Sequence, residues 1–305
     1  MGFFDLHADI AFDLICKKKK GIDNELKKVH LHKFKQGNLK YICMASFFEG
    51  HETWEEMQEM ILELRRQLAT CPEFHLVLKA NDFKEDKINV IMSVEGMCGI
   101  KDNVKDKITW LYDHGIRLAT LTWNDENYLA SGVGGNLNHG LSEAGKEAIK
   151  TMKQLKMIVD VSHANEKTFW DIVECDVDFI ASHSNCYSLC DHRRNLKDKQ
   201  IKALCDKGGI IGMNCFPPFV SKNDTSLKAL IKHMLYIKEL TGSIDHIAFG
   251  FDFMDYFDEG TLDLDDFHDV KDVYKLIEAM KNEFSEEEIK KIAYQNAIDY
   301  FNNHL

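Results

Sequence analysis

The sequence contains little proline and no long apolar run. Three prolines occur among 305 residues, and no segment is rich in proline and serine, so nothing indicates a linker between domains. No stretch approaches the ~20 apolar residues that a membrane-spanning helix needs. The N-terminal segment carries Asp5, His7 and Asp9, where a signal peptide would have an apolar run. We therefore expect one domain over residues 1–305 that does not contact a membrane.

Positive charge is also scarce. The 38 lysines and arginines are outnumbered by 50 aspartates and glutamates, and the resulting net charge of −12 excludes a general attraction to nucleic acid. The tight basic run at residues 17–20 stands beside a glycine and indicates a solvated loop. Nine cysteines, an odd number scattered through apolar segments, favour a reduced, cytoplasmic chain over a secreted one with disulfides.

What the sequence does contain is an alternation of apolar runs and helical patterns. Eight runs rich in Ile, Val, Leu and Phe, each about as long as a strand, lead into a polar residue. They lie at residues 3–6, 41–45, 88–94, 116–121, 157–161, 179–181, 209–213 and 246–251. Between them, residues 52–70 show apolar side chains at helical spacing, Ser142 begins another helical pattern, and Ser285 with Glu288 forms a capping box.

This alternation predicts an α/β fold. Continuous apolar strands separated by amphipathic helices indicate a parallel sheet covered on its outer face, and eight such units over about 300 residues fit a (β/α)8 TIM barrel. An open doubly wound sheet is the alternative, but it would need a glycine-rich phosphate turn after its first strand. That position holds His7, Ala8 and Asp9 instead, so the barrel is the better interpretation.

The expected C-terminal ends of the strands carry imidazole and carboxylate groups, and in a (β/α)8 barrel these ends form the active site. The residues concerned are His7, Asp9, Glu95, His163, His183 and Asp252. A borderline metal such as zinc prefers such ligands. Each residue alone has a structural explanation; Asp252, for example, could cap the segment that follows it. Their joint occurrence predicts a metal site.

The number of candidate ligands predicts two metals. One hydrolytic zinc needs only three protein ligands and an open position. The surplus fits two ions about 3.5–4 Å apart that hold a hydroxide between them as nucleophile. Glu95 is the natural bridge, because a carboxylate offers two oxygens. Arg193 and Arg194 follow the sixth strand, where either an arginine that binds a substrate carboxylate or a solvated surface pair fits the sequence.

The segments that carry these residues resemble the membrane dipeptidase (renal dipeptidase) family of the amidohydrolase-like metal-dependent hydrolases. The segments FDLHADI, MSVEGM, TLTWNDENYLASG, VDVSHAN, ASHSNCYSLCDHRRNLKDKQI, GGIIGMN and IAFGFDF occur in the order seen in that family, from about residue 3 to residue 255. The set is specific, although no single motif is. The chain resembles the bacterial members.

The resemblance implies a zinc-dependent dipeptidase that commonly accepts a D-residue at the C-terminal position of the dipeptide. By position, it implies that His7 and Asp9 bind one Zn²⁺, that His163 and His183 bind the other, and that Glu95 bridges them. Arg194 would hold the substrate carboxylate, and Asp252 would bind the substrate amine and shuttle protons. The resemblance also favours a homodimer.

Two positions depart from the family pattern. Trp123 stands where many animal members have a histidine that could polarise the scissile carbonyl; we expect Trp123 and Asn124 to contact the substrate. The strand-eight element usually reads Asp-Phe-Asp-Gly, whereas here Met254 follows Phe253 and an aspartate comes after it. The chain also lacks the signal sequence and lipid-anchor tail of the animal enzymes, so no membrane attachment is expected.

Our hypothesis is that a metal-bridging hydroxide attacks the peptide carbonyl while Asp252 serves as base and then as acid. The nearest alternative is hydrolysis of another small amide, such as an N-acyl amino acid or a lactam, on the same site. A catalytically silent metal-binding barrel and a metal-free barrel with an Asp/His acid–base pair are the others. Turnover and its sensitivity to chelation distinguish them.

Overall fold

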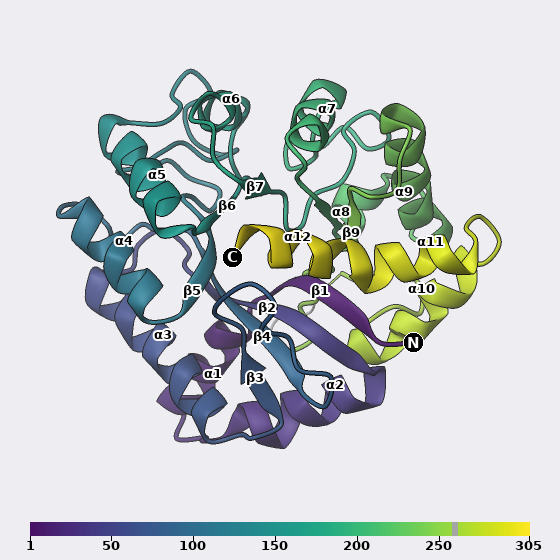
Figure 1. Ribbon diagram of the computed structural model, residues 1–305, viewed down its shortest axis with the longest axis horizontal. Coiled ribbons are helices and arrows are strands. Elements are labelled where there is room, and N and C mark those ends of the chain that lie inside the picture. Colours follow the sequence, from purple (N-terminus) through teal and green to yellow (C-terminus); the bar gives the residue numbers. More distant parts are fainter. Residues whose placement is uncertain (258–261) are drawn as a thin grey trace.

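Eight parallel strands form a barrel in the computed structural model, which describes residues 1–257 and 262–305 (Figure 1). The strands are β1 (Phe3–Ala8), β2 (Leu39–Phe47), β4 (Ile88–Glu95), β5 (Ile116–Thr120), β6 (Ile158–Asp160), β7 (Phe179–Ile180), β8 (Ile211–Met213) and β9 (Ile247–Phe249). They pair in the order β7-β6-β5-β4-β2-β1-β9-β8. A parallel bridge between Ala181 and Ile211 joins the two end strands, so the barrel is nearly closed. The predicted fold class is confirmed, and each predicted apolar run overlaps one strand of the barrel.

One strand was not predicted from the sequence. β3 (Phe74–Leu76) pairs in parallel with β4 outside the barrel order, with Phe74 opposite Ile88. Its three residues are Phe-His-Leu, and the histidine interrupts the apolar character by which the other short strands were predicted.

Helices surround the strands (Figure 1). They are α1 (Ile10–Lys19), α2 (Leu31–Gly37), α3 (Trp54–Ala69), α4 (Val104–Asp113), α5 (Glu143–Leu155), α6 (Glu166–Glu174), α7 (Asp198–Asp206), α8 (Pro217–Val220), α9 (Leu227–Thr241), α10 (Val273–Met280), α11 (Glu286–Lys290) and α12 (Asn296–His304). Short turns of other helix types are η1 (Leu26–His30), η2 (Val270–Asp272) and η3 (Lys291–Gln295). Within the described ranges, no helix has both the length and the apolar character to cross a membrane.

The predicted helix starts are confirmed by their caps. Ser142 is the N-cap of α5 and accepts a hydrogen bond from the backbone N–H of Gly145. Ser285 and Glu288 form a reciprocal capping box at the start of α11. Such caps satisfy backbone N–H groups that a helix leaves unpaired at its N-terminus. The local sequence therefore fixes where these helices begin.

The core has two layers. The larger layer lies between the strands and the surrounding helices. The smaller one fills the barrel and includes Phe4, Leu6, Ile91, Leu118 and Ile180 together with Phe301 of α12. The rings of Phe4 and Phe301 stack with their centroids 5.5 Å apart. Because Phe4 lies near the start of β1, α12 closes the N-terminal end of the barrel and leaves the C-terminal end for the site.

Candidate metal centre

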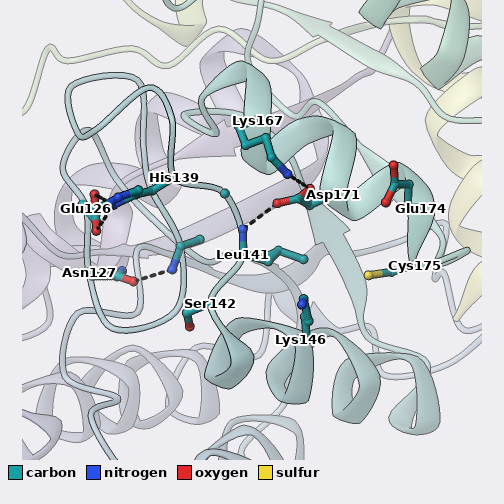
Figure 2. A pocket seen from close by; sticks show the side chains of 12 residues that line it. Glu126, Asn127, His139, Leu141, Ser142, Lys146, Lys167, Asp171, Glu174 and Cys175 are labelled. Atoms are coloured by element: carbon teal, nitrogen blue, oxygen red, sulfur yellow. Dashed lines mark hydrogen bonds and ion pairs between the residues drawn. The ribbon is translucent and has the colours of Figure 1, made fainter.

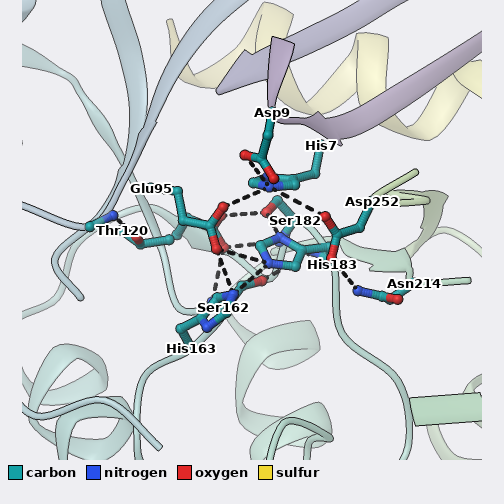
Figure 3. Close-up of polar contacts among 12 residues, drawn as sticks. His7, Asp9, Glu95, Thr120, Ser162, His163, Ser182, His183, Asn214 and Asp252 are labelled. Atoms are coloured by element: carbon teal, nitrogen blue, oxygen red, sulfur yellow. Dashed lines mark hydrogen bonds and ion pairs between the residues drawn. The ribbon is translucent and has the colours of Figure 1, made fainter. Parts of the chain in front are cut away.

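Glu95 lies at the centre of the strand-end cluster (Figure 3). It is the last residue of β4, and its two carboxylate oxygens face different histidines. Glu95 Oε2 is 2.9 Å from His7 Nε2, whereas Glu95 Oε1 is 2.6 Å from His163 Nε2 and 3.6 Å from His183 Nε2. Asp9 Oδ1 lies 3.3 Å from His7 Nε2 on the other side. The structure thus brings together the five residues that the sequence analysis offered as ligands.

The hydrogen bonds of His163 and His183 fix which ring nitrogens carry protons. His163 Nδ1 lies 3.1 Å from Asn124 Oδ1, and an amide oxygen only accepts, so Nδ1 carries the proton. His183 Nδ1 lies 2.7 Å from Ser182 Oγ, whose own proton goes to a carboxylate of Asp160. Both Nε2 atoms are therefore left with lone pairs, and they face each other at 3.0 Å. Two lone pairs at this distance, beside a carboxylate, require a cation.

Two more atoms of the cluster have no hydrogen-bond partner among the residues that the structure describes, namely His7 Nε2 and Asp9 Oδ1. Both side chains are buried, and a buried polar atom without a partner costs about 1–3 kcal/mol. Ligand atoms of His7, Glu95 and His183 lie within 4.8 Å of one another, as do those of His7, Asp9 and Asp252. Imidazole nitrogens and carboxylate oxygens are zinc ligands, so the residues present fit metal ions.

The electrostatics of the cluster agree with this chemistry. Burial lowers the pKa of His163 to about 4, helped by the nearby Arg194, and burial holds the pKa of His183 well below its usual range. Both imidazoles are thus neutral, which is the metal-binding form. Burial would raise the pKa of Glu95, but interactions with the neighbouring imidazoles of His163 and His7 outweigh burial and hold it well below its usual range. Burial and the neighbouring Glu95 raise the pKa of Asp9 to about 8, a strain that a cation would relieve.

Asp252 lies at the edge of the cluster. Its Oδ1 is 3.9 Å from His7 Nε2, and its Oδ2 accepts a hydrogen bond of 3.0 Å from the side chain of Asn214. The carboxylate is 18% exposed, the most exposed of the acidic side chains at the site. One oxygen is therefore held in place while the other faces both the cluster and the open end of the barrel.

Arg194 is buried and Arg193 is exposed. The guanidinium of Arg194 makes one long hydrogen bond, from Nη2 to the carbonyl of His183 at 3.4 Å. Its Nε has no partner within residues 1–257 and 262–305. A cavity of about 280 Å³ opens beside Arg194 and His163, and its wall includes Leu137 and Tyr187. A buried cation with unused donors beside a cavity can bind an anionic ligand group.

Two site residues have a backbone that non-glycine residues adopt only rarely. The φ angle is 69° at His163 and 59° at Asp252, both in the left-handed region. Such a conformation costs about 1–3 kcal/mol and clusters at functional sites. At His163 it is held by a hydrogen bond of 2.9 Å from the N–H of Val133 to the His163 carbonyl. The loop after β5 therefore supports the histidine.

The structure places Trp123 and Asn124 beside the cluster. The Trp123 ring packs edge-on against Phe47, with centroids 5.1 Å apart, and lies 6.1 Å from the His163 ring. The Asn124 side chain uses its amide oxygen to orient His163. A contact of either residue with substrate stays a prediction.

A larger cavity, of about 730 Å³, lies away from the strand ends between the loop after β5 and the helices α5 and α6 (Figure 2). Asp171 forms an ion pair with Lys167 of the same helix, α6, and it ties this helix to the loop by accepting a hydrogen bond of 2.9 Å from the N–H of Leu141. Its lining contains none of the strand-end residues, so this cavity belongs to the support of the loop.

Several residues that shape the site were not found from the sequence. They are Asp5, Asp160, Ser162, Ser182, Asn214 and Tyr256, whose hydroxyl accepts a hydrogen bond of 2.7 Å from the N–H of Asp9. Asn214 follows β8 and could have been found by its strand-end position. Ser162 and Ser182 likewise follow β6 and β7. Asp5, Asp160 and Tyr256 act through contacts with Phe251, Ser182 and Asp9 that lie 22 or more residues away, and no local pattern marks those contacts.

Comparisons with known proteins point to one family. The model of the membrane dipeptidase family (peptidase family M19) matches residues 1–303. An uncharacterised protein of Klebsiella pneumoniae, from the pqqA 5′ region, is 32% identical over 245 residues, which are 75% of this chain and 88% of that protein. An uncharacterised dipeptidase of Schizosaccharomyces pombe is 32% identical over 177 residues, 56% of this chain and 43% of the yeast protein.

Solved structures show the same fold. A metallopeptidase from Rhodobacter sphaeroides, liganded with a phosphinate mimic of the dipeptide L-Ala-D-Ala, superposes with a TM-score of 0.87 at 21% identity, covering 100% of this chain and 99% of that one. A dipeptidase of family M19 superposes with a TM-score of 0.88 at 22% identity, covering 100% and 98%.

Proposed function

Because the chain belongs to the membrane dipeptidase family, a family of metallopeptidases, we propose that it is a dipeptidase with two zinc ions that hydrolyses dipeptides, including those with a D-residue at the C-terminal position. The observation that carries this proposal is the buried cluster around Glu95, where the Nε2 atoms of His7, His163 and His183 converge with the carboxylates of Glu95 and Asp9. The phosphinate dipeptide mimic bound by the Rhodobacter sphaeroides metallopeptidase supports the substrate class.

In this proposal, His7 and Asp9 hold one zinc, His163 and His183 hold the other, and Glu95 binds both. The placement of Glu95 supports its bridging role, since Oε2 lies 2.9 Å from His7 Nε2 and Oε1 lies 2.6 Å from His163 Nε2. Zinc ions bound there would supply Lewis acidity, which activates water and polarises the scissile carbonyl.

Arg194 binds the free carboxylate of the dipeptide in this proposal. Support comes from its burial and from the absence of a partner for Nε in the described part of the chain. A carboxylate held there fixes the C-terminal end of the substrate. A substrate that reaches from Arg194 to the cluster is thereby limited to two residues. The cavity of about 280 Å³ beside Arg194 would take the C-terminal side chain of the substrate.

Asp252 accepts the proton of the attacking water and delivers it to the leaving amine in this proposal. Its free oxygen faces the cluster, 3.9 Å from His7 Nε2, while Asn214 holds the other oxygen. A general base must lie within reach of the proton it takes, directly or through one water. The same carboxylate would also bind the ammonium group of the substrate.

The test is turnover of L-L and L-D dipeptides by the protein as purified, after chelation, and after zinc is added back. We expect turnover that disappears with the metal and returns with zinc, and two zinc ions per chain by elemental analysis. Activity that survives chelation contradicts the metal assignment. Bound metal without turnover of any dipeptide would favour another small amide, such as an N-acyl amino acid or a lactam, or a catalytically silent barrel.

We further propose, from the sequence, that residues 1–305 form one hydrolase domain that resides in the cytoplasm. We also propose a homodimer, which the resemblance to the family favours. Light scattering of the purified protein tests it.

A further inference from the structure

Asp160 is a buried carboxylate that belongs to no part of the proposed chemistry. It is the last residue of β6 and is 4% exposed. Its Oδ1 accepts hydrogen bonds of 3.0 Å from the backbone N–H groups of Ser162 and Ser182, and its Oδ2 accepts one from the Ser182 hydroxyl. Ser162 and Ser182 directly precede His163 and His183. The carboxylate therefore ties together the ends of the two strands that carry this histidine pair.

The Ser182 hydroxyl links Asp160 to the His183 ring. A hydroxyl has one proton to donate, and an ionised carboxylate can only accept. Since Ser182 Oγ donates to Asp160, it must accept from His183 Nδ1, which lies 2.7 Å away. The proton of the neutral imidazole is thus held on Nδ1, and the lone pair is on Nε2, which faces His163 Nε2 and Glu95.

We propose that Asp160 is a positioning residue of the metal centre that acts through the Ser182 hydroxyl to hold His183 in the tautomer whose Nε2 binds metal. This inference rests on the proposed metal centre but not on the proposed substrate. Partners of this kind behind a histidine ligand fix its tautomer and ring orientation, and their loss commonly lowers metal affinity about 10- to 100-fold.

Asp5 provides a matched control within the same barrel. Its Oδ1 accepts hydrogen bonds from the N–H of His7 at 3.2 Å and of Phe251 at 2.9 Å, so it ties the ends of β1 and β9 as Asp160 ties those of β6 and β7. No hydroxyl links Asp5 to an imidazole among the hydrogen bonds of the described residues. Substitution of Asp5 therefore removes a buried carboxylate at a strand end but does not change the tautomer of a histidine ligand.

The decisive variant is Asp160→Asn. The asparagine oxygen still accepts from the two backbone N–H groups, but an NH₂ group now faces Ser182 Oγ. The hydroxyl then accepts from this NH₂ and donates to His183 Nδ1. The imidazole proton moves to Nε2, and that nitrogen can no longer bind metal. Ser182→Ala removes the link without forcing the wrong tautomer, so it should weaken metal binding less.

Two measurements test the proposal on the full chain. Imidazole ¹⁵N chemical shifts of the metal-free protein report the tautomer of His183, and titration with Zn²⁺ in a competing chelator reports affinity. We expect Asp160→Asn to move the His183 proton to Nε2 and to weaken one of two zinc sites about 10- to 100-fold, whereas Asp5→Asn leaves the His183 tautomer unchanged.

The proposal is overturned if Asp160→Asn keeps the wild-type tautomer, or if it binds both zinc ions as tightly as the wild type. If Asp160→Asn does not fold, Ser182→Ala decides: unchanged affinity at both sites overturns the proposal, and weakening of one site supports it. Failure of the wild-type protein to bind zinc would instead contradict the proposed function, so the two failures are distinguishable.

Discussion

Replacement of Arg194 by methionine should weaken substrate binding without destabilising the protein. Arg194 is 5% exposed, and among the residues that the structure describes its guanidinium hydrogen-bonds only to the His183 carbonyl, at 3.4 Å. Burial lowers the pKa of Arg194, although the carboxylates of Glu95, Asp252 and Asp160 oppose this effect. The free protein therefore carries a buried cation whose hydrogen-bonding capacity is only partly used.

The magnitudes follow from this environment. Two charge-assisted hydrogen bonds to a substrate carboxylate contribute about 1.5–3 kcal/mol each, and losing one partner of such a buried pair costs about 2–5 kcal/mol. We therefore expect Arg194→Met to lower kcat/KM for dipeptides about 30- to 4000-fold, mainly through KM. Replacing an incompletely paired buried charge by an apolar side chain is often neutral or stabilising, so the free energy of unfolding should not decrease by more than about 1 kcal/mol.

The assay compares a dipeptide with the same dipeptide carrying a C-terminal carboxamide. The wild type should discriminate strongly against the amide, and Arg194→Met should hydrolyse both poorly and at similar rates. The exposed neighbour supplies the control, since Arg193→Met should keep the discrimination. Retention of wild-type kcat/KM for the free dipeptide by Arg194→Met, or equal losses for the dipeptide and its amide, would refute the reasoning.

Three further predictions concern other parts of the molecule. Asp252→Asn should lower kcat about 10²- to 10⁴-fold while zinc content, measured by elemental analysis, stays unchanged; loss of zinc would contradict a role in proton transfer alone. Glu63 is buried, which raises its pKa, but hydrogen bonds from Arg66, Gln67 and Lys18 outweigh burial and lower the pKa to about 2. Its stabilisation is therefore complete above its unfolded pKa of about 4.3 and is lost as the pH falls towards 2. Glu63→Gln should lower the free energy of unfolding by about 2 kcal/mol at pH 7 and by less at pH 3. Urea titrations of the variant and the wild type at both pH values measure this difference, and an equal difference at the two pH values would contradict the assignment. Phe301→Ala should destabilise the protein by about 3–5 kcal/mol without changing KM, because the Phe301 ring fills the end of the barrel opposite the site; a changed KM would argue against that separation.

The sequence by itself determined the barrel and the cluster of candidate ligands. Short apolar runs indicate the strands, and capping residues such as Ser142 indicate where helices begin. Both signals are local properties of the sequence. Once eight parallel strands alternate with helices, every strand ends at the same face. The order of the chain alone then predicts that His7, Glu95 and His183 meet, and they do.

Only the tertiary structure decided how these side chains are held. It buries Arg194 and exposes Arg193, although the two are adjacent in the sequence. It turns the amide oxygen of Asn124 towards His163, and it connects Asp160 through Ser182 to His183. These relations depend on distances of a few ångströms between side chains, most of which are 20 or more residues apart, and on which proton each atom can donate. A one-dimensional pattern specifies the faces of strands and helices, but not the contacts across the barrel that orient each ligand.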